Sequence, residues 1–258
     1  MISVQQVSFS VKNKTLVSNV SLNIAPGEFV VVMGANGAGK STLLKMMSGA
    51  IQPATGSISY RSRTLAQYKT EELAKLRAVL SQHYHISFPM RAREIVMMGR
   101  YPYFTSHPSL TDERKVNEAM EKMQVTILAE RMYHTLSGGE AQKIQMCRVL
   151  AQIGDTSKDD PKFLLLDEPV SHLDIKYQHQ LLKEAKQLCE QNVAVLAVLH
   201  DVNLALKYAD RILFMKEGVV VKELARNETL TTGLLKQVFD VDASIFSMPE
   251  GNGVFVSF

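Results

Sequence analysis

The chain has 258 residues, of which 46% are hydrophobic and 21% are charged, with 8 prolines and 14 glycines. This is an ordinary globular composition with enough apolar material for one large core, so one composite domain is the simplest expectation. The net charge is only +3 and the basic residues are scattered among acids, which argues against nucleic acid as a partner.

The first 82 residues carry mainly strand patterns, with apolar residues at alternate positions or in short continuous runs. Strands are predicted at 2–11, 20–24, 29–33, 57–60 and 79–81. A capped helix start is expected at Thr70. The N-terminal strands are interpreted as a β-hairpin layer.

The pattern changes to helices between about 83 and 158, where helices are predicted at 91–98, 111–123 with Thr111 at the N-cap, and 137–152. After a polar loop at 154–161, short apolar strands alternate with helices, which indicates a mostly parallel sheet. These later elements are predicted at 163–166, 175–190, 193–199, 201–208 and 230–239, with a hairpin around 216–218. The expected organisation is a single α/β domain, with a core at 1–82 and 159–258 and a helical insertion at 83–158.

A phosphate-binding loop follows the apolar run 29–33. The segment 34–41 fits the pattern G-x-x-x-x-G-K-[S/T] at every fixed position, and a helical pattern follows it, which is the required context. Glycines let the backbone wrap around phosphates, the helix N-terminus attracts anions, and Lys40 adds a mobile positive charge. The predicted nucleotide contacts here are Gly34, Ala35, Asn36, Gly37, Ala38, Gly39, Lys40, Ser41 and Thr42. The hydroxyl of Ser41 is placed to ligate Mg²⁺.

Two carboxylates, Asp167 and Glu168, end the apolar run that begins at Phe163. Alone, this pattern is weak, because many strands end in acids. Behind a phosphate loop it is typical of an ATPase, in which Asp167 holds Mg²⁺ and Glu168 polarises the attacking water.

A third motif, beside the phosphate loop and the two carboxylates, is the segment Leu136-Ser137-Gly138-Gly139-Glu140. Ser137 can cap a helix, while Gly138 and Gly139 expose backbone N–H groups and form a second anion cradle. With the phosphate loop ahead of it, this segment resembles the signature of the ATP-binding subunits of ATP-binding-cassette (ABC) transporters, and the resemblance runs from the first residues to at least His200.

The resemblance implies a RecA-like P-loop NTPase fold with an N-terminal antiparallel β subdomain and an inserted helical subdomain. It also implies a head-to-tail homodimer that encloses two ATP molecules, because the signature of one subunit completes the nucleotide site of the other. Further site residues follow by position. Gln82 resembles the Mg²⁺- and water-sensing glutamine, Asp174 lies in the inter-subunit loop 171–174, and His200 resembles the histidine at the γ-phosphate.

One position departs from the family pattern. Val11 stands where many relatives carry an aromatic residue that stacks on adenine, and Phe9 is nearby on the same strand. Because side chains alternate along a strand, the sequence does not decide whether the ring of Phe9 reaches the base.

The transported substrate is suggested by the helical insertion. Met90, Met97, Met98 and the segment 99–102 (Gly-Arg-Tyr-Pro) resemble the permease-binding region of importers for iron chelates, haem and cobalamin. The stretch 148–152 with its following polar loop resembles haem (haemin) importers, and ferric siderophore and cobalamin remain alternatives. His83-Tyr84-His85 has too few ligands for a strong metal site.

The resemblance places the chain at the cytoplasmic face of the bacterial inner membrane, bound to permease subunits that a periplasmic binding protein serves. The longest apolar runs are far shorter than a membrane span of about 20 residues, and no secretory signal is recognised. Cys147 and Cys189 are interpreted as core thiols in a reducing compartment. A soluble cassette ATPase of a cofactor-assembly complex remains a second functional class.

Overall fold

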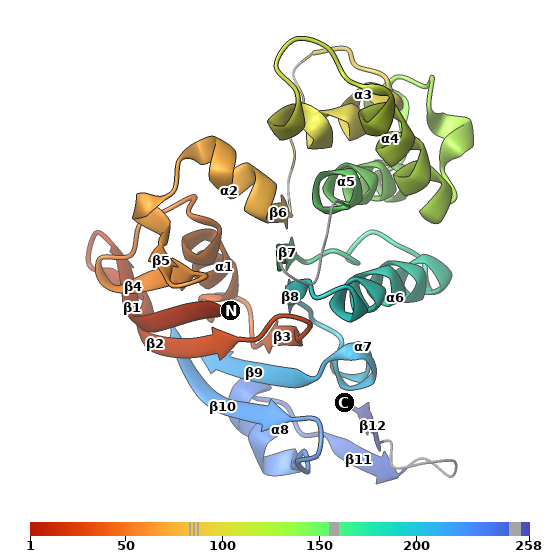
Figure 1. Cartoon of the computed structure of the whole chain (residues 1–258). Coiled ribbons are helices and arrows are strands. Elements are labelled where there is room, and N and C mark those ends of the chain that lie inside the picture. Colours follow the sequence, from red (N-terminus) through yellow and green to blue (C-terminus); the bar gives the residue numbers. More distant parts are fainter. Residues whose placement is uncertain (83, 85, 87, 155–159, 248–253) are drawn as a thin grey trace. The chain divides into compact units, whose positions relative to one another are not determined.

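The computed structural model describes residues 1–82, 84, 86, 88–154, 160–247 and 254–258. The chain divides into two compact units (Figure 1). Unit 1 comprises Met1–Gln67 and Ala194–Phe258, and unit 2 comprises Tyr68–Val193. The expected division into a core at 1–82 and 159–258 and a helical insertion at 83–158 stays a prediction.

An antiparallel sheet forms the N-terminal part of unit 1. Its strands, in spatial order, are β2 (Lys14–Ile24), β1 (Ile2–Val11), β4 (Thr55–Tyr60) and β5 (Arg63–Thr64). In the register, Val4 lies opposite Leu22 on one side and Ile58 on the other, and all three side chains are buried. The predicted β layer is thereby confirmed.

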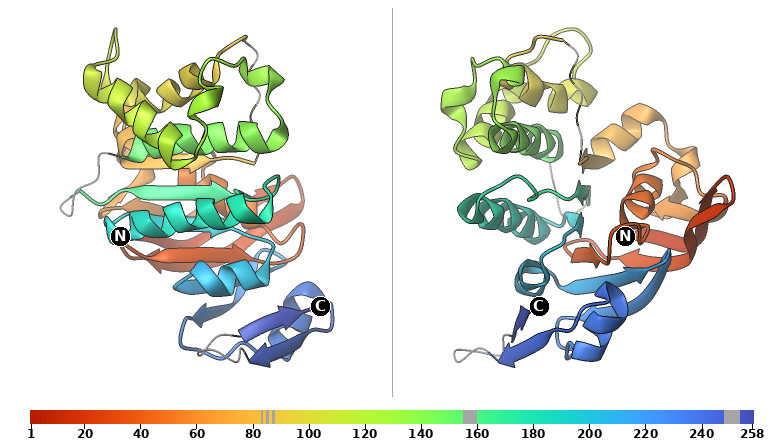
Figure 2. Two further views of the ribbon diagram at one scale, coloured as in Figure 1. Left: turned by 90° about the vertical axis from the view of Figure 1, so that its right-hand side faces the viewer. Right: turned by 180° about the vertical axis from the view of Figure 1, so that it is seen from behind.

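A second set of strands in unit 1 is mainly parallel (Figure 2). Strand β3 (Phe29–Met33) pairs in parallel with both β8 (Ala194–Val198) and β9 (Arg211–Lys216), while β10 (Val219–Ala225) runs antiparallel to β9. Strands β3 and β8 are buried along their whole length, which explains why their sequences are continuously apolar. Helices α1 (Lys40–Ser48), α7 (Val202–Tyr208) and α8 (Thr232–Phe239) complete this part, with a 3₁₀ turn at Leu65–Gln67.

A C-terminal hairpin, β11 (Ser244–Ser247) and β12 (Val254–Ser257), was not predicted. Its strands have four residues each and carry little apolar periodicity, so they give only a weak sequence signal.

Unit 2 combines a parallel strand pair with helices. Strands β6 (Arg77–Leu80) and β7 (Phe163–Asp167) pair in parallel. Helix α5 (Gly138–Ile153) packs against α3 (Ala92–Met97) and α4 (Leu110–Lys122). The unit also contains α2 (Thr70–Leu76), α6 (Ile175–Glu190) and 3₁₀ segments at Met98–Tyr103, Thr126–Leu128 and Tyr133–Thr135.

One of two predicted helix starts needs correction. The N-cap of α4 is Ser109, not Thr111, because the Ser109 hydroxyl accepts a hydrogen bond from the Asp112 N–H while the Asp112 carboxylate accepts one from the Ser109 N–H. Helix α2 begins at Thr70 as predicted, and Glu72 caps it by accepting the Lys69 N–H at 2.8 Å.

A buried ion pair joins the helices of unit 2. The Nε atom of Arg100 lies 2.9 Å from Oδ1 of Asp112, and both side chains are almost fully buried. Arg100 also donates to the carbonyl of Ala151 at 2.8 Å, and its guanidinium lies 3.8 Å from the centre of the Tyr103 ring. Each group thus has partners where water is absent.

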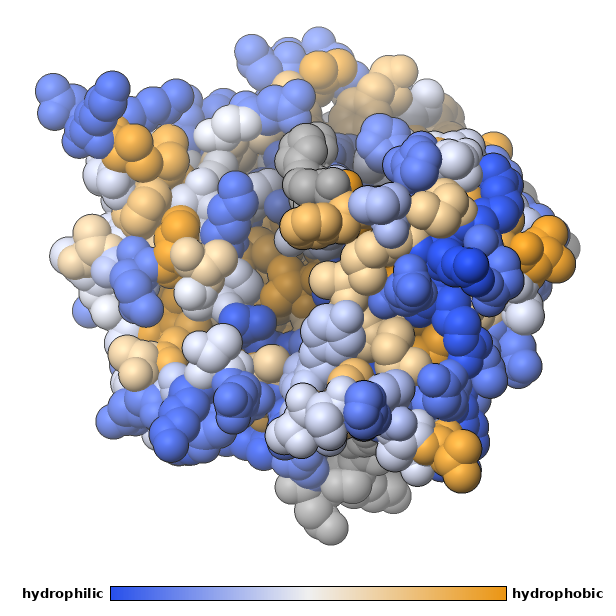
Figure 3. All heavy atoms as spheres, turned by 90° about the horizontal axis from the view of Figure 1, so that it is seen from above, coloured by the Kyte–Doolittle hydropathy of each residue, from blue (hydrophilic) through white to orange (hydrophobic). Residues whose placement is uncertain are grey.

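Within the part of the chain that the structure describes, no helix is both long enough and apolar enough to cross a bilayer. The space-filling view from above shows apolar side chains at the surface in separate patches among polar ones (Figure 3).

Candidate functional site

The phosphate loop in unit 1 follows β3 directly and depends on its glycines for close packing. Gly34 and Gly39 have φ angles of 152° and 97°. A Cβ atom on Gly34 would lie 2.1 Å from the carbonyl oxygen of Met215, and one on Gly39 would lie 2.3 Å from that of Leu16. Gly37 differs, because its surroundings are open and only its φ of 81° favours glycine. The backbone of the loop is therefore held against the ends of β9 and β2.

Positive charge and helix polarity converge at this loop. Lys40 is only 6% exposed, and its ammonium donates to the carbonyls of Gly34 at 2.8 Å and Ala35 at 3.0 Å. The N-cap of α1, Gly39, offers no side-chain hydrogen bond, and the first turn contains no acid. The N-cap side chains of α4 to α8 accept hydrogen bonds from their helices, namely those of Ser109, Ser137, Asp174, Asp201 and Thr231. The start of α1 is thus suited to an external anion.

His200 lies at the same edge of the unit 1 sheet as the loop. Strands β3 and β8 are parallel neighbours with Val32 opposite Val198, and the Leu199 N–H donates to the Val32 carbonyl at 3.3 Å. Because parallel strands end at one edge, the residues that follow them meet there. His200 is exposed at this edge.

Unit 2 brings together the predicted acids and the predicted glutamine. Leu80 of β6 lies opposite Leu166 of β7, so Gln82 and the two acids follow neighbouring strand ends. The Gln82 amide donates to Oε2 of Glu168 at 2.8 Å. Asp167 is 4% exposed.

Glu168 is held in an unusual backbone conformation. Its φ of 51° lies in the left-handed region, which is strained for residues other than glycine. The Ser171 hydroxyl donates to the Glu168 carbonyl at 3.1 Å, and the Gln142 amide of α5 donates to the Pro169 carbonyl at 3.0 Å. Sequence reasoning missed Gln142; a polar residue within the buried stripe of a helix is the signal that marks it.

The segment 136–140 forms the start of α5 as predicted. The Ser137 hydroxyl accepts from the Glu140 N–H at 3.3 Å, and the Glu140 carboxylate accepts from the Ser137 N–H at 2.8 Å. The Ser137 N–H and the Ser137 hydroxyl both donate to the Glu140 carboxylate, and these two bonds hold the pKa of Glu140 below its usual range. A Cβ on Gly139 would lie 3.1 Å from the His172 carbonyl oxygen, whereas Gly138 has space.

Two further predicted contacts have local roles that do not involve nucleotide. Asp174 is the N-cap of α6 and accepts from the Tyr177 N–H at 3.0 Å. Val11 lies opposite Lys14 at the β1–β2 turn and is 48% exposed. Their roles toward ATP remain predictions.

His83 and His85 lie outside the described residues, and only Tyr84 of that segment is described. Tyr84 is partly buried, and its hydroxyl accepts from Arg148 at 3.3 Å. Burial raises the pKa of Tyr84.

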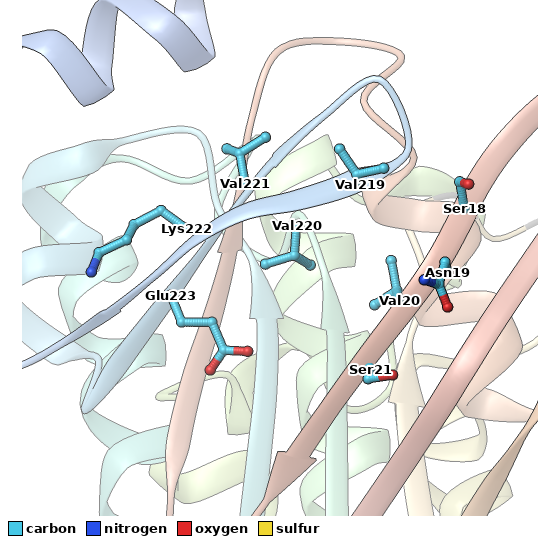
Figure 4. Close-up of a pocket in the computed structure, with 9 residues that line it drawn as sticks. All are labelled: Ser18, Asn19, Val20, Ser21, Val219, Val220, Val221, Lys222 and Glu223. Carbon is cyan, nitrogen blue, oxygen red and sulfur yellow. The ribbon is translucent and has the colours of Figure 1, made fainter.

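A groove in unit 1 contains none of the predicted site residues (Figure 4). The Ser18 N–H of β2 donates to the Gly218 carbonyl at 2.8 Å, and the groove lies between β2 and β10 beyond this bond. Its lining residues are Ser18, Asn19, Val20, Ser21, Val219, Val220, Val221, Lys222 and Glu223.

Comparison with known proteins identifies similar chains along nearly the whole length. The family model described as "ABC transporter" matches residues 17–171. The hemin import ATP-binding protein HmuV of Gloeobacter violaceus is 40% identical over 249 residues, which cover 96% of this chain and 90% of that protein. HmuV of Escherichia coli O157:H7 is 37% identical over 257 residues, with 99% and 98% covered.

Solved structures agree with this similarity. An ABC transporter assigned to the metal-chelate type, in an inward-facing conformation, has a TM-score of 0.78 and 27% identity over 99% of this chain and 95% of that chain. The dimeric post-hydrolysis state of the cassette MJ0796, bound to ADP and Pi, has a TM-score of 0.77 and 25% identity, and the match covers 89% of this chain and 100% of that chain.

Proposed function

This chain belongs to the ABC transporter family as an ATP-binding ATPase subunit, and from that premise we propose that its ATP hydrolysis drives an importer for haem (haemin). The observation that carries the proposal is the similarity to hemin import ATP-binding proteins, which extends over 96% to 99% of the chain. Importers of ferric siderophores or cobalamin are the alternatives of the same class, and a soluble assembly ATPase is the alternative of another class.

ATP binds at the start of α1. Lys40 exchanges its bonds to the loop carbonyls for bonds to the phosphates, whose charge the uncapped helix end also attracts. Mg²⁺ fits the donor groups present, because this ion prefers oxygen ligands and is usually bound by few protein groups together with phosphates and water. The hydroxyl of Ser41, the buried carboxylate of Asp167 and the amide oxygen of Gln82 would hold it. When bound, the ion neutralises phosphate charge.

Hydrolysis depends on Glu168. Its carboxylate accepts a proton from the attacking water, while Gln82, which bonds Oε2, holds that carboxylate in place. His200 contacts the γ-phosphate from the end of β8. The variant Glu168→Gln should bind ATP and dimerise without turnover, whereas Glu190→Gln, which changes an exposed acid on α6, should hydrolyse ATP normally. Wild-type activity in Glu168→Gln contradicts the assignment.

Two copies assemble head to tail, with Ser137 and Gly138 of one copy against the ATP of the other. Because Gly138 has space for a methyl group, Gly138→Ala should fold normally. It should nonetheless fail to dimerise with ATP in the Glu168→Gln background, as measured by light scattering, since the added methyl group blocks approach to the phosphates. Unimpaired dimerisation counts against this contact.

A membrane permease binds to unit 2. Met98 and Tyr101, which flank the buried Gly99 and Arg100 in sequence, are 37% and 53% exposed although they are apolar, and Phe88 of the same unit is 78% exposed. Such exposed apolar side chains suit a short helix of a partner. The subunit is peripheral on the cytoplasmic face of the membrane, and a periplasmic binding protein delivers the substrate from the other side.

The experiment that tests the proposal begins with isolation of the chain from native membranes in mild detergent with ATP and Mg²⁺. A co-purified multi-spanning protein supports the importer, whereas a soluble partner alone supports an assembly ATPase. The ATPase of the reconstituted complex is then measured with binding protein loaded with haem, ferric siderophore or cobalamin. Stimulation by haem alone is expected, and stimulation by another substrate alone overturns the haem assignment.

A further inference from the structure

The C-terminal hairpin has no strand neighbour of its own. Strands β11 and β12 pair with each other, with Ile245 opposite Val256, and no other described strand joins them. A two-stranded hairpin is at most marginally stable in water. Support from outside the hairpin is therefore required.

Asn203 of α7 provides that support. The Val256 N–H donates to Oδ1 of Asn203 at 2.8 Å, and the Asn203 amide donates to the Val256 carbonyl at 3.0 Å. This pair of bonds is the one that a neighbouring strand would make with a strand residue. Val256 is only 2% exposed and Asn203 is partly buried, so both bonds are shielded from water.

The same helix determines where His200 lies. Leu199 is bonded to β3, and Asp201 caps α7 by accepting the N–H groups of Asn203 at 2.7 Å and Leu204 at 3.0 Å. His200 thus occupies the single position between the sheet and the helix. Because α7 has only seven residues, its orientation depends on tertiary contacts rather than on its own helical stability.

A second connection runs from the hairpin to the base of the phosphate loop. Phe258 makes an edge-to-face contact with Phe239 at 5.9 Å, and Phe239 makes one with Phe214 at 6.4 Å. Phe214 on β9 lies opposite Met33, the residue before Gly34. The C-terminal residues therefore contact α7 directly, and they are connected to β9 through Phe239.

We propose that Asn203 is a positioning residue for ATP hydrolysis, which acts by anchoring α7 to β12 and so fixing His200. The inference rests on the proposed function, since it requires that His200 acts on the γ-phosphate. The C-terminal hairpin is then part of the ATPase machinery, although it supplies no group to the nucleotide.

The test compares ATP turnover and ATP affinity among variants. Asn203→Ala should lower kcat roughly 10- to 100-fold, the range that a displacement of about 1 Å can cause in a catalytic group, while the Kd for ATP stays unchanged because the phosphate loop is intact. The control Lys207→Ala changes an exposed side chain of the same helix and should keep both values. An unchanged kcat in Asn203→Ala overturns the proposal.

A second variant tests the proposal if Asn203→Ala does not fold. Asn203→Asp keeps an acceptor for the Val256 N–H but loses the donor, and a carboxylate in the first turn favours the helix. A folded Asn203→Asp protein with lowered kcat supports the proposal, and one with wild-type kcat contradicts it.

The background of His200→Ala separates positioning from general damage. Adding Asn203→Ala to His200→Ala should lower kcat no further, because residues that act as one unit are not additive. A further drop overturns the proposal. If His200→Ala alone keeps wild-type turnover, the proposed role of His200 fails; if His200→Ala is inactive and Asn203→Ala is normal, only the coupling through Asn203 fails.

Discussion

Replacing Asp112 with asparagine should destabilise unit 2 severely, because it removes the countercharge of a buried guanidinium. The Arg100 and Asp112 side chains are 3% and 4% exposed. Without the carboxylate, the Arg100 guanidinium still meets the Ala151 carbonyl and the face of Tyr103, neither of which carries a countercharge. Removing one partner of a buried ion pair lowers the free energy of unfolding by about 3–5 kcal/mol. This is a large part of a typical free energy of unfolding of about 5–15 kcal/mol.

Thermal and urea unfolding measure this effect. A loss of about 3–5 kcal/mol lowers the Tm of a domain of this size by roughly 6–20 °C. Glu113→Gln is the matched control, since Glu113 is the next residue on α4 and pairs with Arg93 at a half-exposed site. Such pairs contribute about 0–1 kcal/mol, so the Tm of this control should hardly change.

The double variant Arg100→Met with Asp112→Leu tests the reasoning itself. Apolar side chains of similar volume can replace a buried ion pair at little cost, so the double variant should unfold close to the wild type. If Asp112→Asn costs less than about 1 kcal/mol, or if the double variant is less stable than Asp112→Asn, the damage does not come from an uncompensated buried charge.

Three further predictions concern acid stability, thiol reactivity and adenine binding. Burial raises the pKa of the Asp112 carboxyl, but hydrogen bonds from Ser109 and Arg100 outweigh the effect of burial and leave this pKa below its usual value. The lowered pKa contributes folding stability that is present above the unfolded pKa of about 4 and is lost as the pH falls through the folded pKa. The Tm of Asp112→Asn should therefore decline less on acidification than the Tm of the wild type. Burial raises the pKa of the Cys147 thiol far above its usual range, so Cys147 and the buried Cys189 should stay unalkylated in native protein and react in urea, whereas native labelling contradicts this. Val11→Tyr should lower the Kd for ATP about fivefold, from roughly 1 kcal/mol of base stacking, and an unchanged Kd rules out Val11 as the adenine contact.

The elements predicted correctly from sequence are those with continuous apolar runs and clear punctuation. Strands β3 and β7 were identified because their runs of five buried residues stop at Gly34 and at Glu168. The cap of α4 was misplaced because both Ser109 and Thr111 are cap-forming residues, and only Ser109 has an acid three positions later.

Hydrogen bonds between residues far apart in the sequence could not be predicted from residue patterns. The bond between Gln82 and Glu168 joins residues 86 positions apart, and it exists because β6 and β7 happen to be neighbours. The hydrogen bonds between Asn203 and Val256 join residues 53 positions apart. On Val256 they involve backbone groups, so the type of residue at 256 does not predict them. Periodicity describes what one element buries, not which element it meets.

The uncapped start of α1 bears on how long the protein survives in a cell. A ligand that binds the native chain and not the unfolded one stabilises it by RT ln(1 + [L]/Kd), about 2.7 kcal/mol at a hundredfold excess over Kd. Newly made copies that meet abundant ATP are therefore withdrawn from the pool that proteases attack, whereas copies starved of nucleotide are cleared first.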